Sequence, residues 1–142
     1  MNQMLIDDVD YRILQLLIQD STLSNKDIGE QVHMTGQAVG ARIRKMRDTG
    51  VIEGYSVLWN PEKLGLSVHA FVTVFLSSNS AHQSFRQFVM SEPQVAEVHR
   101  VSGEGCYWMR IRTEDQGKLS EVLDRLLQFG NYKVSLAIGT IK

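Results

Sequence analysis

The sequence predicts an α+β protein, with an N-terminal three-helix helix-turn-helix domain followed by a C-terminal ferredoxin-like βαββαβ domain. Two observations support this prediction. Apolar residues recur with helical spacing before Asn60-Pro61, and with mixed strand and helix spacing after it. Pro61 also disfavours a helical conformation at Asn60, which suits a joint between domains. We therefore expect a helix-turn-helix domain with its linking strand over residues 1–60 and a second domain over residues 61–142.

The first two helices are predicted from their capping residues and apolar stripes. Asp7 or Asp8 can cap the first helix. Ser24-Asn25-Lys26-Asp27 resembles a capping box with Asp in the place of Glu, so it marks the start of the second helix. His33-Met34 is then a tight connection to the next helix. The buried stripe of the first helix comprises Val9, Ile13, Leu16 and Leu17.

The third helix is predicted to begin after Thr35, whose hydroxyl can cap it, and to run to about Asp48. Gly50 suits the position just beyond the C-terminal end of that helix. The apolar residues of Val51–Leu58 then predict a strand that leads towards the second domain.

The second half of the chain has the element order strand, helix, strand, strand, helix, strand. Four residues with two glycines, Ser102–Gly105, suit a hairpin between the second and third strands. This order predicts a ferredoxin-like sheet with both helices on one face. The predicted strands are Val68–Leu76, Val95–Val101, Cys106–Arg112 and Tyr132–Ile141, and the predicted helices are Ala81–Met90 and Glu114–Gln128.

Large apolar residues alternate on both faces of the predicted sheet. Val72 and Val74 would point to one face, whereas Phe71 and Phe75 would point to the other, together with Trp108. A sheet that has helices on one side only would expose the second set to water. We therefore expect a homodimer in which two copies pack sheet to sheet.

The third helix has the pattern of a DNA-recognition helix. Val39, Ile43 and Met46 cluster on one side, while the opposite side is small and polar at its start and cationic further along. In this arrangement the first residues reach base edges and the cations contact phosphates of double-stranded DNA. The expected DNA-binding residues are Ser24, Asn25, Lys26, Thr35, Gln37, Ala38, Ala41, Arg42, Arg44 and Lys45.

The chain resembles the Lrp/AsnC (leucine-responsive, feast/famine) family of transcriptional regulators over nearly its whole length. The resemblance implies DNA binding by the first domain, dimers that assemble further into octamers or related rings, and an amino-acid or similar effector near the Gly103 hairpin. The residues that carry it are Ile6–Leu14, Leu23-Ser24, Asp27-Ile28, Val32, Met34-Thr35, Val39, Arg42–Arg44, Met46, Gly50, Ile52, Gly54-Tyr55, Asn60-Pro61, Lys63–Gly65, Val101–Gly103 and Tyr107.

One departure from the family concerns the effector site that the resemblance implies, which comprises Ser102, Gly103, Glu104, Gly105, Cys106 and Tyr107. The typical family hairpin reads Gly-x-x-Asp-Tyr, and its Asp helps to hold the amino group of the effector. Here Cys106 replaces that Asp, and Glu104 lies two positions earlier. Either the ligand differs or the protein acts without one, and we expect a weak or absent response to common amino acids.

Several classes of protein are disfavoured by composition. The single cysteine, Cys106, cannot form an internal disulfide, and the four histidines lack metal-ligand spacing, so we expect no metal and no cofactor. No apolar run approaches the length of a membrane span, which favours a cytoplasmic protein without a membrane partner. Two alternatives remain: a small-molecule-binding assembly protein whose helical half mediates protein contacts, and an enzyme built on the ferredoxin-like half, for which no nucleophile or base is evident.

Overall fold

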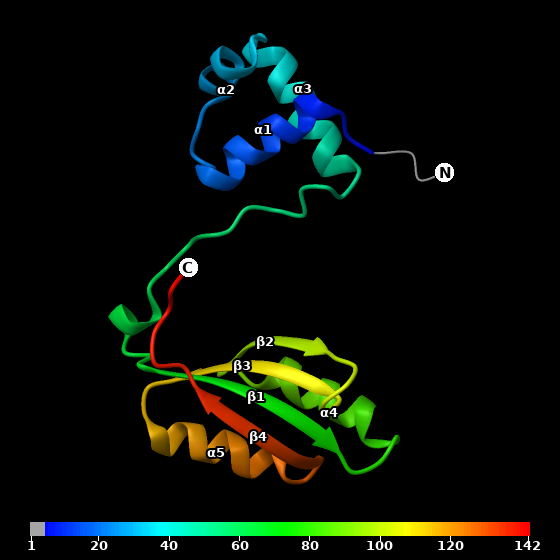
Figure 1. The fold of residues 1–142 in the computed structure, drawn as a ribbon, viewed down its shortest axis with the longest axis vertical. Coiled ribbons are helices and arrows are strands. Elements are labelled where there is room, and N and C mark those ends of the chain that lie inside the picture. Colours follow the sequence, from blue (N-terminus) through cyan, green and yellow to red (C-terminus); the bar gives the residue numbers. More distant parts are fainter. Residues whose placement is uncertain (1–4) are drawn as a thin grey trace. The chain divides into compact units, whose positions relative to one another are not determined.

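The computed structural model describes residues 5–142, which form two compact units divided between Leu58 and Trp59 (Figure 1). The N-terminal unit contains helices α1 (Asp8–Gln19), α2 (Asn25–Val32) and α3 (Gly36–Asp48). The C-terminal unit contains a short 3-10 helix (Pro61–Leu64), β1 (Val68–Leu76), α4 (Ala81–Ser91), β2 (Val95–Arg100), β3 (Tyr107–Thr113), α5 (Gln116–Leu126) and β4 (Gly130–Leu136).

Each helix of the N-terminal unit begins directly after a residue that the sequence predicts as a cap, and of the two candidates for α1 the cap is Asp7. The side chains of Asp7, Ser24 and Thr35 accept hydrogen bonds from backbone amides in the first turns of α1, α2 and α3. Capping of this kind satisfies amide groups that have no partner within the helix. The three helices enclose one apolar core of Ile13, Leu16, Leu17, Ile28, Val39, Met46 and Ile52.

The predicted strand Val51–Leu58 is wrong, because this segment has no regular secondary structure. Tyr55 and Val57 are 52% and 75% exposed to solvent, and Leu58 is fully exposed. A strand is stabilised by hydrogen bonds to a neighbouring strand, and no strand of residues 5–142 pairs with this segment. The apolar pattern alone therefore does not produce a strand within one chain.

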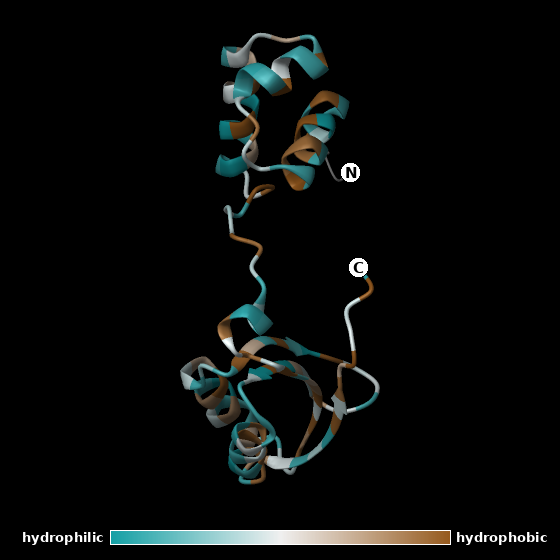
Figure 2. Cartoon of the chain, turned by 90° about the vertical axis from the view of Figure 1, so that its left-hand side faces the viewer, coloured by the Kyte–Doolittle hydropathy of each residue, from teal (hydrophilic) through white to brown (hydrophobic). Residues whose placement is uncertain are grey.

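The C-terminal unit has the predicted ferredoxin-like topology. Its four strands are antiparallel in the order β2-β3-β1-β4, so the first strand is central and pairs with β3 and β4. Val72 of β1 lies opposite Met109 on one side and Val134 on the other. Both helices lie on one face of the sheet (Figure 2).

The core of the C-terminal unit lies between that helical layer and the sheet. Alternate residues of β1 and β3 point into it, and Val72, Val74 and Met109 are fully buried. The predicted assignment of residues to the two sheet faces is therefore confirmed. The core residues are Ala70, Val72, Val74, Phe85, Tyr107, Met109, Ile111, Leu119, Val122, Leu126 and Phe129.

The last strand differs from its prediction at both ends. We expected it over Tyr132–Ile141, but β4 begins at Gly130 and ends at Leu136. Leu136 lies opposite Ala70, close to the first residue of β1, which is Val68. The Ala137 amide still donates to the His69 carbonyl oxygen at 2.8 Å, and beyond it little of β1 remains for later residues to pair with. The start depends on close approach, because a Cβ atom on Gly130 would lie 1.9 Å from the Phe75 carbonyl oxygen.

No helix within residues 5–142 is both long enough and apolar enough to span a lipid bilayer.

Candidate nucleic-acid interface

The connection between α2 and α3 is a tight turn that depends on a glycine. His33 adopts a left-handed conformation (φ 57°, ψ 46°), and the Met34 amide donates to the Gly29 carbonyl oxygen at 2.9 Å. A Cβ atom on Gly29 would lie 2.4 Å from the Met34 carbonyl oxygen, far inside van der Waals contact. The turn therefore packs directly on the backbone of α2, which fixes the direction in which α3 leaves it.

The exposed face of α3 carries the side chains that the helical periodicity predicts. Val39 and Met46 are fully buried against α1 and α2, whereas Gln37, Ala41 and Arg44 on the opposite side are exposed. Lys45 is also exposed, and Ala38 is partly buried. This exposed face leaves α3 free to enter the major groove of DNA. The role of each residue in DNA binding stays a prediction.

The starts of α2 and α3 both present hydroxyl groups. The Ser24 hydroxyl oxygen accepts from the Asp27 amide at 3.0 Å, and the Thr35 hydroxyl oxygen accepts from the Ala38 amide at 3.2 Å. Each hydroxyl keeps its own proton to donate to an anion. Asn25 and Lys26 follow Ser24 and are exposed, so the start of α2 offers polar and cationic groups to a phosphate.

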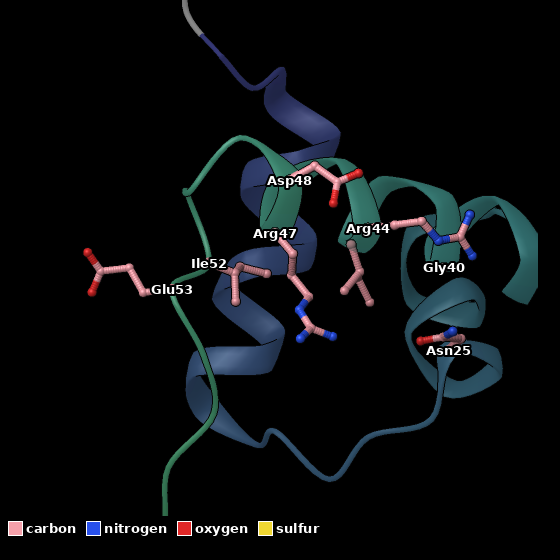
Figure 3. A pocket seen from close by; sticks show the side chains of 8 residues that line it. Asn25, Gly40, Arg44, Arg47, Asp48, Ile52 and Glu53 are labelled. Atoms are coloured by element: carbon pink, nitrogen blue, oxygen red, sulfur yellow. The ribbon is translucent and has the colours of Figure 1, made fainter.

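A groove of about 490 Å³ runs between the start of α2, α3 and the segment that follows α3 (Figure 3). Arg44 and Arg47 of α3 are the two cations of its lining, and Asp48 and Glu53 are its two carboxylates. Arg47 is not among the DNA-binding residues that the sequence predicts, although it flanks the buried stripe of α3 on the side opposite Arg42. Its guanidinium lies 5.8 Å from the centre of the Tyr55 ring, which steadies it at the edge of the groove.

Two glycines of α3 allow this close packing. A Cβ atom on Gly40 would lie 3.0 Å from Nδ2 of Asn25, and one on Gly36 would lie 3.4 Å from the Lys26 backbone nitrogen. Glycine costs helix stability relative to alanine, but at both positions the space is needed because the glycines face the start of α2.

Arg42 was expected to contact DNA, but its guanidinium faces α1. Its Nη1 atom lies 2.8 Å from Asp7 Oδ2 and 2.9 Å from Asp10 Oδ1. Lys45 also reaches α1, with Nζ 3.3 Å from Asp10 Oδ2. Burial raises the pKa of Asp10, but hydrogen bonds from Arg42, from the Asp7 amide and from Lys45 outweigh it, so the pKa lies below its usual value.

The predicted effector hairpin, Ser102–Gly105, connects β2 and β3 and is closed by a bond from the Val101 amide to the Cys106 carbonyl oxygen, at 3.0 Å. The Cys106 amide donates to the Val74 carbonyl oxygen at 2.7 Å. Glu104 forms an ion pair with Lys133 of β4. The one carboxylate of the hairpin therefore already has a cationic partner.

Tyr107, the last of the predicted effector residues, is buried and points into the core. Its hydroxyl lies 3.0 Å from Nδ1 of His82 and accepts a bond from Nε of Arg86 at 3.4 Å. Both partners lie on α4, and nothing in their local sequence indicates that they meet this tyrosine. Within residues 5–142, no three His, Cys, Asp or Glu side chains are grouped so that they could hold a metal ion.

Comparison with known families assigns both units. The model of the AsnC-type helix-turn-helix domain matches residues 6–47, and the model of the Lrp/AsnC ligand binding domain matches residues 69–142.

Individual relatives match over almost the whole chain. The HTH-type transcriptional regulator LrpB of Bacillus subtilis (strain 168) is 42% identical over 139 residues, which cover 98% of this chain and 93% of the relative. The regulator LrpA of the same organism is 37% identical and covers 95% and 99%. The structure of the transcriptional regulator NMB0573 from Neisseria meningitidis, described as a complex with L-Met, has a TM-score of 0.90 at 27% identity and covers 96% of this chain and 92% of that one.

Proposed function

Because the chain belongs to the Lrp/AsnC family of helix-turn-helix transcriptional regulators, we propose that it reads double-stranded DNA through the exposed face of α3. The observation that carries this proposal is the position of Gln37, Ala41 and Arg44 on that face, held outward by the burial of Val39 and Met46. An amide and small methyl groups can contact base edges, and a guanidinium can contact phosphate or guanine.

The supporting contacts come from the two helix starts. The phosphates that flank the DNA groove are bound by Ser24, Asn25 and Lys26 at the start of α2 and by Thr35 at the start of α3. Ala38 and Lys45 line the side of α3 that faces α1. Arg47, at the edge of the groove of Figure 3, adds a further cation.

The test of this interface is the salt dependence of DNA binding. Each phosphate contact contributes about 0.9 to the slope of log affinity against log salt concentration. The double variant Arg44→Ala/Lys45→Ala should bind every duplex more weakly, with a slope that is smaller by about one for each phosphate that it no longer neutralises. Lys118→Ala, which removes an exposed cation from α5, is the matched control and should bind like wild type. A wild-type slope in the double variant would disprove this interface.

We also propose that two copies pair through the sheet face opposite α4 and α5. On that face the Phe71 and Trp108 rings stack with centroids 5.3 Å apart, and the Arg110 guanidinium lies 5.6 Å from the centre of the Phe71 ring. Both helices of the C-terminal unit lie on the other face of the sheet (Figure 2). Such a pair presents two copies of α3 to half-sites about 34–36 Å apart, or a multiple of that distance, and dimers assemble further into octamers or related rings.

Sedimentation velocity tests the dimer. Phe71→Asp should shift the protein to the monomer, because a charge would be buried between the two sheets. Leu127→Asp changes a side chain that is 54% exposed beside the opposite, helical face, so it serves as the control and should leave the dimer intact. A dimeric Phe71→Asp variant would exclude this face as the interface.

For the effector, we propose that the hairpin region does not accept an ordinary amino acid. Cys106 provides no carboxylate for an ammonium group, and Glu104 is engaged by Lys133. Thermal-shift measurements with L-methionine and L-leucine should show little change in melting temperature. A clear rise with either amino acid would contradict this proposal.

A further inference from the structure

The N-terminus of α1 contains a carboxylate that is completely removed from solvent. The side chain of Asp10 is 0% exposed, although Asp10 lies in the first turn of a short surface helix. Asp10 and Asp7 form a reciprocal capping box: the Asp10 amide donates to Asp7 Oδ1 at 2.8 Å, and the Asp7 amide donates to Asp10 Oδ2 at 3.1 Å. The capping box alone leaves a buried negative charge without a cation.

The cations come from α3. Nη1 of Arg42 is within 2.9 Å of both Asp7 oxygens and of Asp10 Oδ1, and Nζ of Lys45 lies 3.3 Å from Asp10 Oδ2. Both oxygens of the buried carboxylate therefore have a partner on α3. We call Asp7, Asp10, Arg42 and Lys45 the α1–α3 clamp.

The clamp limits what Arg42 can do. If its guanidinium turned to a DNA phosphate, Asp10 Oδ1 would lose its cationic partner, and the Lys45 ammonium and the Asp7 amide would remain only on Oδ2, which is a costly arrangement for a buried carboxylate. Lys45 is in a different position, since its side chain is 53% exposed and its bond to Asp10 is longer. Arg42 therefore remains with α1 while Lys45 can exchange partners.

The clamp also restricts the rotation of α3 about its own axis. Successive residues of a helix are about 100° apart, so a rotation that released Arg42 would also turn Ala41 and Arg44 away from their outward positions. We propose that Asp10 and Arg42 are positioning residues, which hold the reading face of α3 towards DNA, and that Arg42 itself makes no phosphate contact. This inference rests on the proposed function and adds a determinant of sequence specificity to it.

The experiment compares two equal changes on one helix, Arg42→Gln and Arg44→Gln, in the full-length chain. Affinity is measured over a salt series for a duplex that the wild type selects from a randomised pool and for a scrambled duplex of the same composition. Arg44→Gln should reduce the salt slope by about one for each phosphate that it no longer neutralises. Arg42→Gln should keep the wild-type slope on the scrambled duplex, while its preference for the selected duplex falls by about tenfold, the value of one well-placed base contact.

Two further variants separate positioning from a general loss of folding. Arg42→Lys should retain the preference within a few-fold, because a single nitrogen of Arg42 makes all the contacts and an ammonium can replace it. Asp10→Asn/Arg42→Gln removes the buried charge together with its partner, so it should remain folded and lose no more preference than Arg42→Gln alone.

The outcomes that would overturn the proposal are distinct. A reduced salt slope in Arg42→Gln, equal to that of Arg44→Gln, would show that Arg42 contacts phosphate. A wild-type preference in Arg42→Gln, or a larger loss of preference in Asp10→Asn/Arg42→Gln than in Arg42→Gln alone, would show that the clamp does not position α3. Absence of any sequence preference in the wild-type chain would overturn the proposed function itself, and this inference with it.

Discussion

Replacing Gly105 by Ala should destabilise the C-terminal unit far more than replacing Gly103, although both glycines belong to the same hairpin. Both have positive φ angles, +77° for Gly105 and +96° for Gly103. A Cβ atom on Gly105 would lie 2.5 Å from Cγ2 of Thr73 and 3.0 Å from the Val74 carbonyl oxygen, whereas one on Gly103 would meet nothing within 4 Å. The pair therefore separates backbone strain, which both variants share, from steric overlap, which only one has.

The expected magnitudes follow from these distances. A left-handed conformation costs an alanine about 1–2 kcal/mol, partly offset by the lower entropy of the unfolded chain, so Gly103→Ala should lose about 1 kcal/mol. Overpacking adds about 1–3 kcal/mol, which gives about 2–4 kcal/mol for Gly105→Ala. For a unit of this size, that corresponds to roughly 10–20 °C in Tm, against roughly 5 °C for Gly103→Ala.

Tryptophan fluorescence is a suitable probe for thermal unfolding, because Trp59 and Trp108 are the only tryptophans of the chain and both lie in the C-terminal unit. Equal Tm losses in the two variants would refute the reasoning, since the hairpin would then not rest against β1. The same measurement bears on the effector proposal, because it shows whether Gly105 is required by packing rather than by a ligand.

Three further outcomes are expected. Gly29→Ala should abolish DNA binding and lower the stability of the N-terminal unit, measured by circular dichroism, because the new Cβ would overlap the Met34 carbonyl oxygen. The pKa of Asp10 is lower in the folded state than in the unfolded state, so its ion pairs stabilise the protein fully above the unfolded-state pKa. This contribution disappears as pH falls below about 4. In urea titrations at different pH values, Asp10→Asn should therefore reduce the loss of stability on the acid side. Phe85→Ala should cost about 3–5 kcal/mol in denaturant unfolding, because the side chain is fully buried; a loss below about 1 kcal/mol would contradict the described core.

The architecture could be predicted from the sequence because local patterns determine it. The spacing of Val39 and Met46 identifies the buried side of α3, and alternation along β1 and β3 separates the two sheet faces. In each case the pattern that identifies the buried side lies within one helix or strand, so it can be read from the sequence of that element alone.

The interactions of charged side chains could not be predicted in the same way. Arg42 has the appearance of a solvent-facing cation, but its partners Asp7 and Asp10 lie 35 and 32 positions earlier. Glu104 and Lys133 are 29 positions apart and meet through the sheet. The strand predicted over Val51–Leu58 is wrong for a related reason. A strand needs a neighbouring strand to pair with, and the apolar pattern of the segment itself does not show whether one is present.

The central position of β1 determines when the C-terminal unit can fold during synthesis. Its partners lie far along the chain, and β4 ends at Leu136, about 60 residues after β1 ends at Leu76. At about 5–20 residues per second, both apolar faces of β1 emerge roughly 3–12 s before the sheet can be completed. The N-terminal unit ends at Leu58 and can fold in the meantime, so the nascent chain carries a finished helical unit beside an unpaired apolar strand. In this interval β1 is the segment of the nascent chain most open to aggregation and to binding by chaperones.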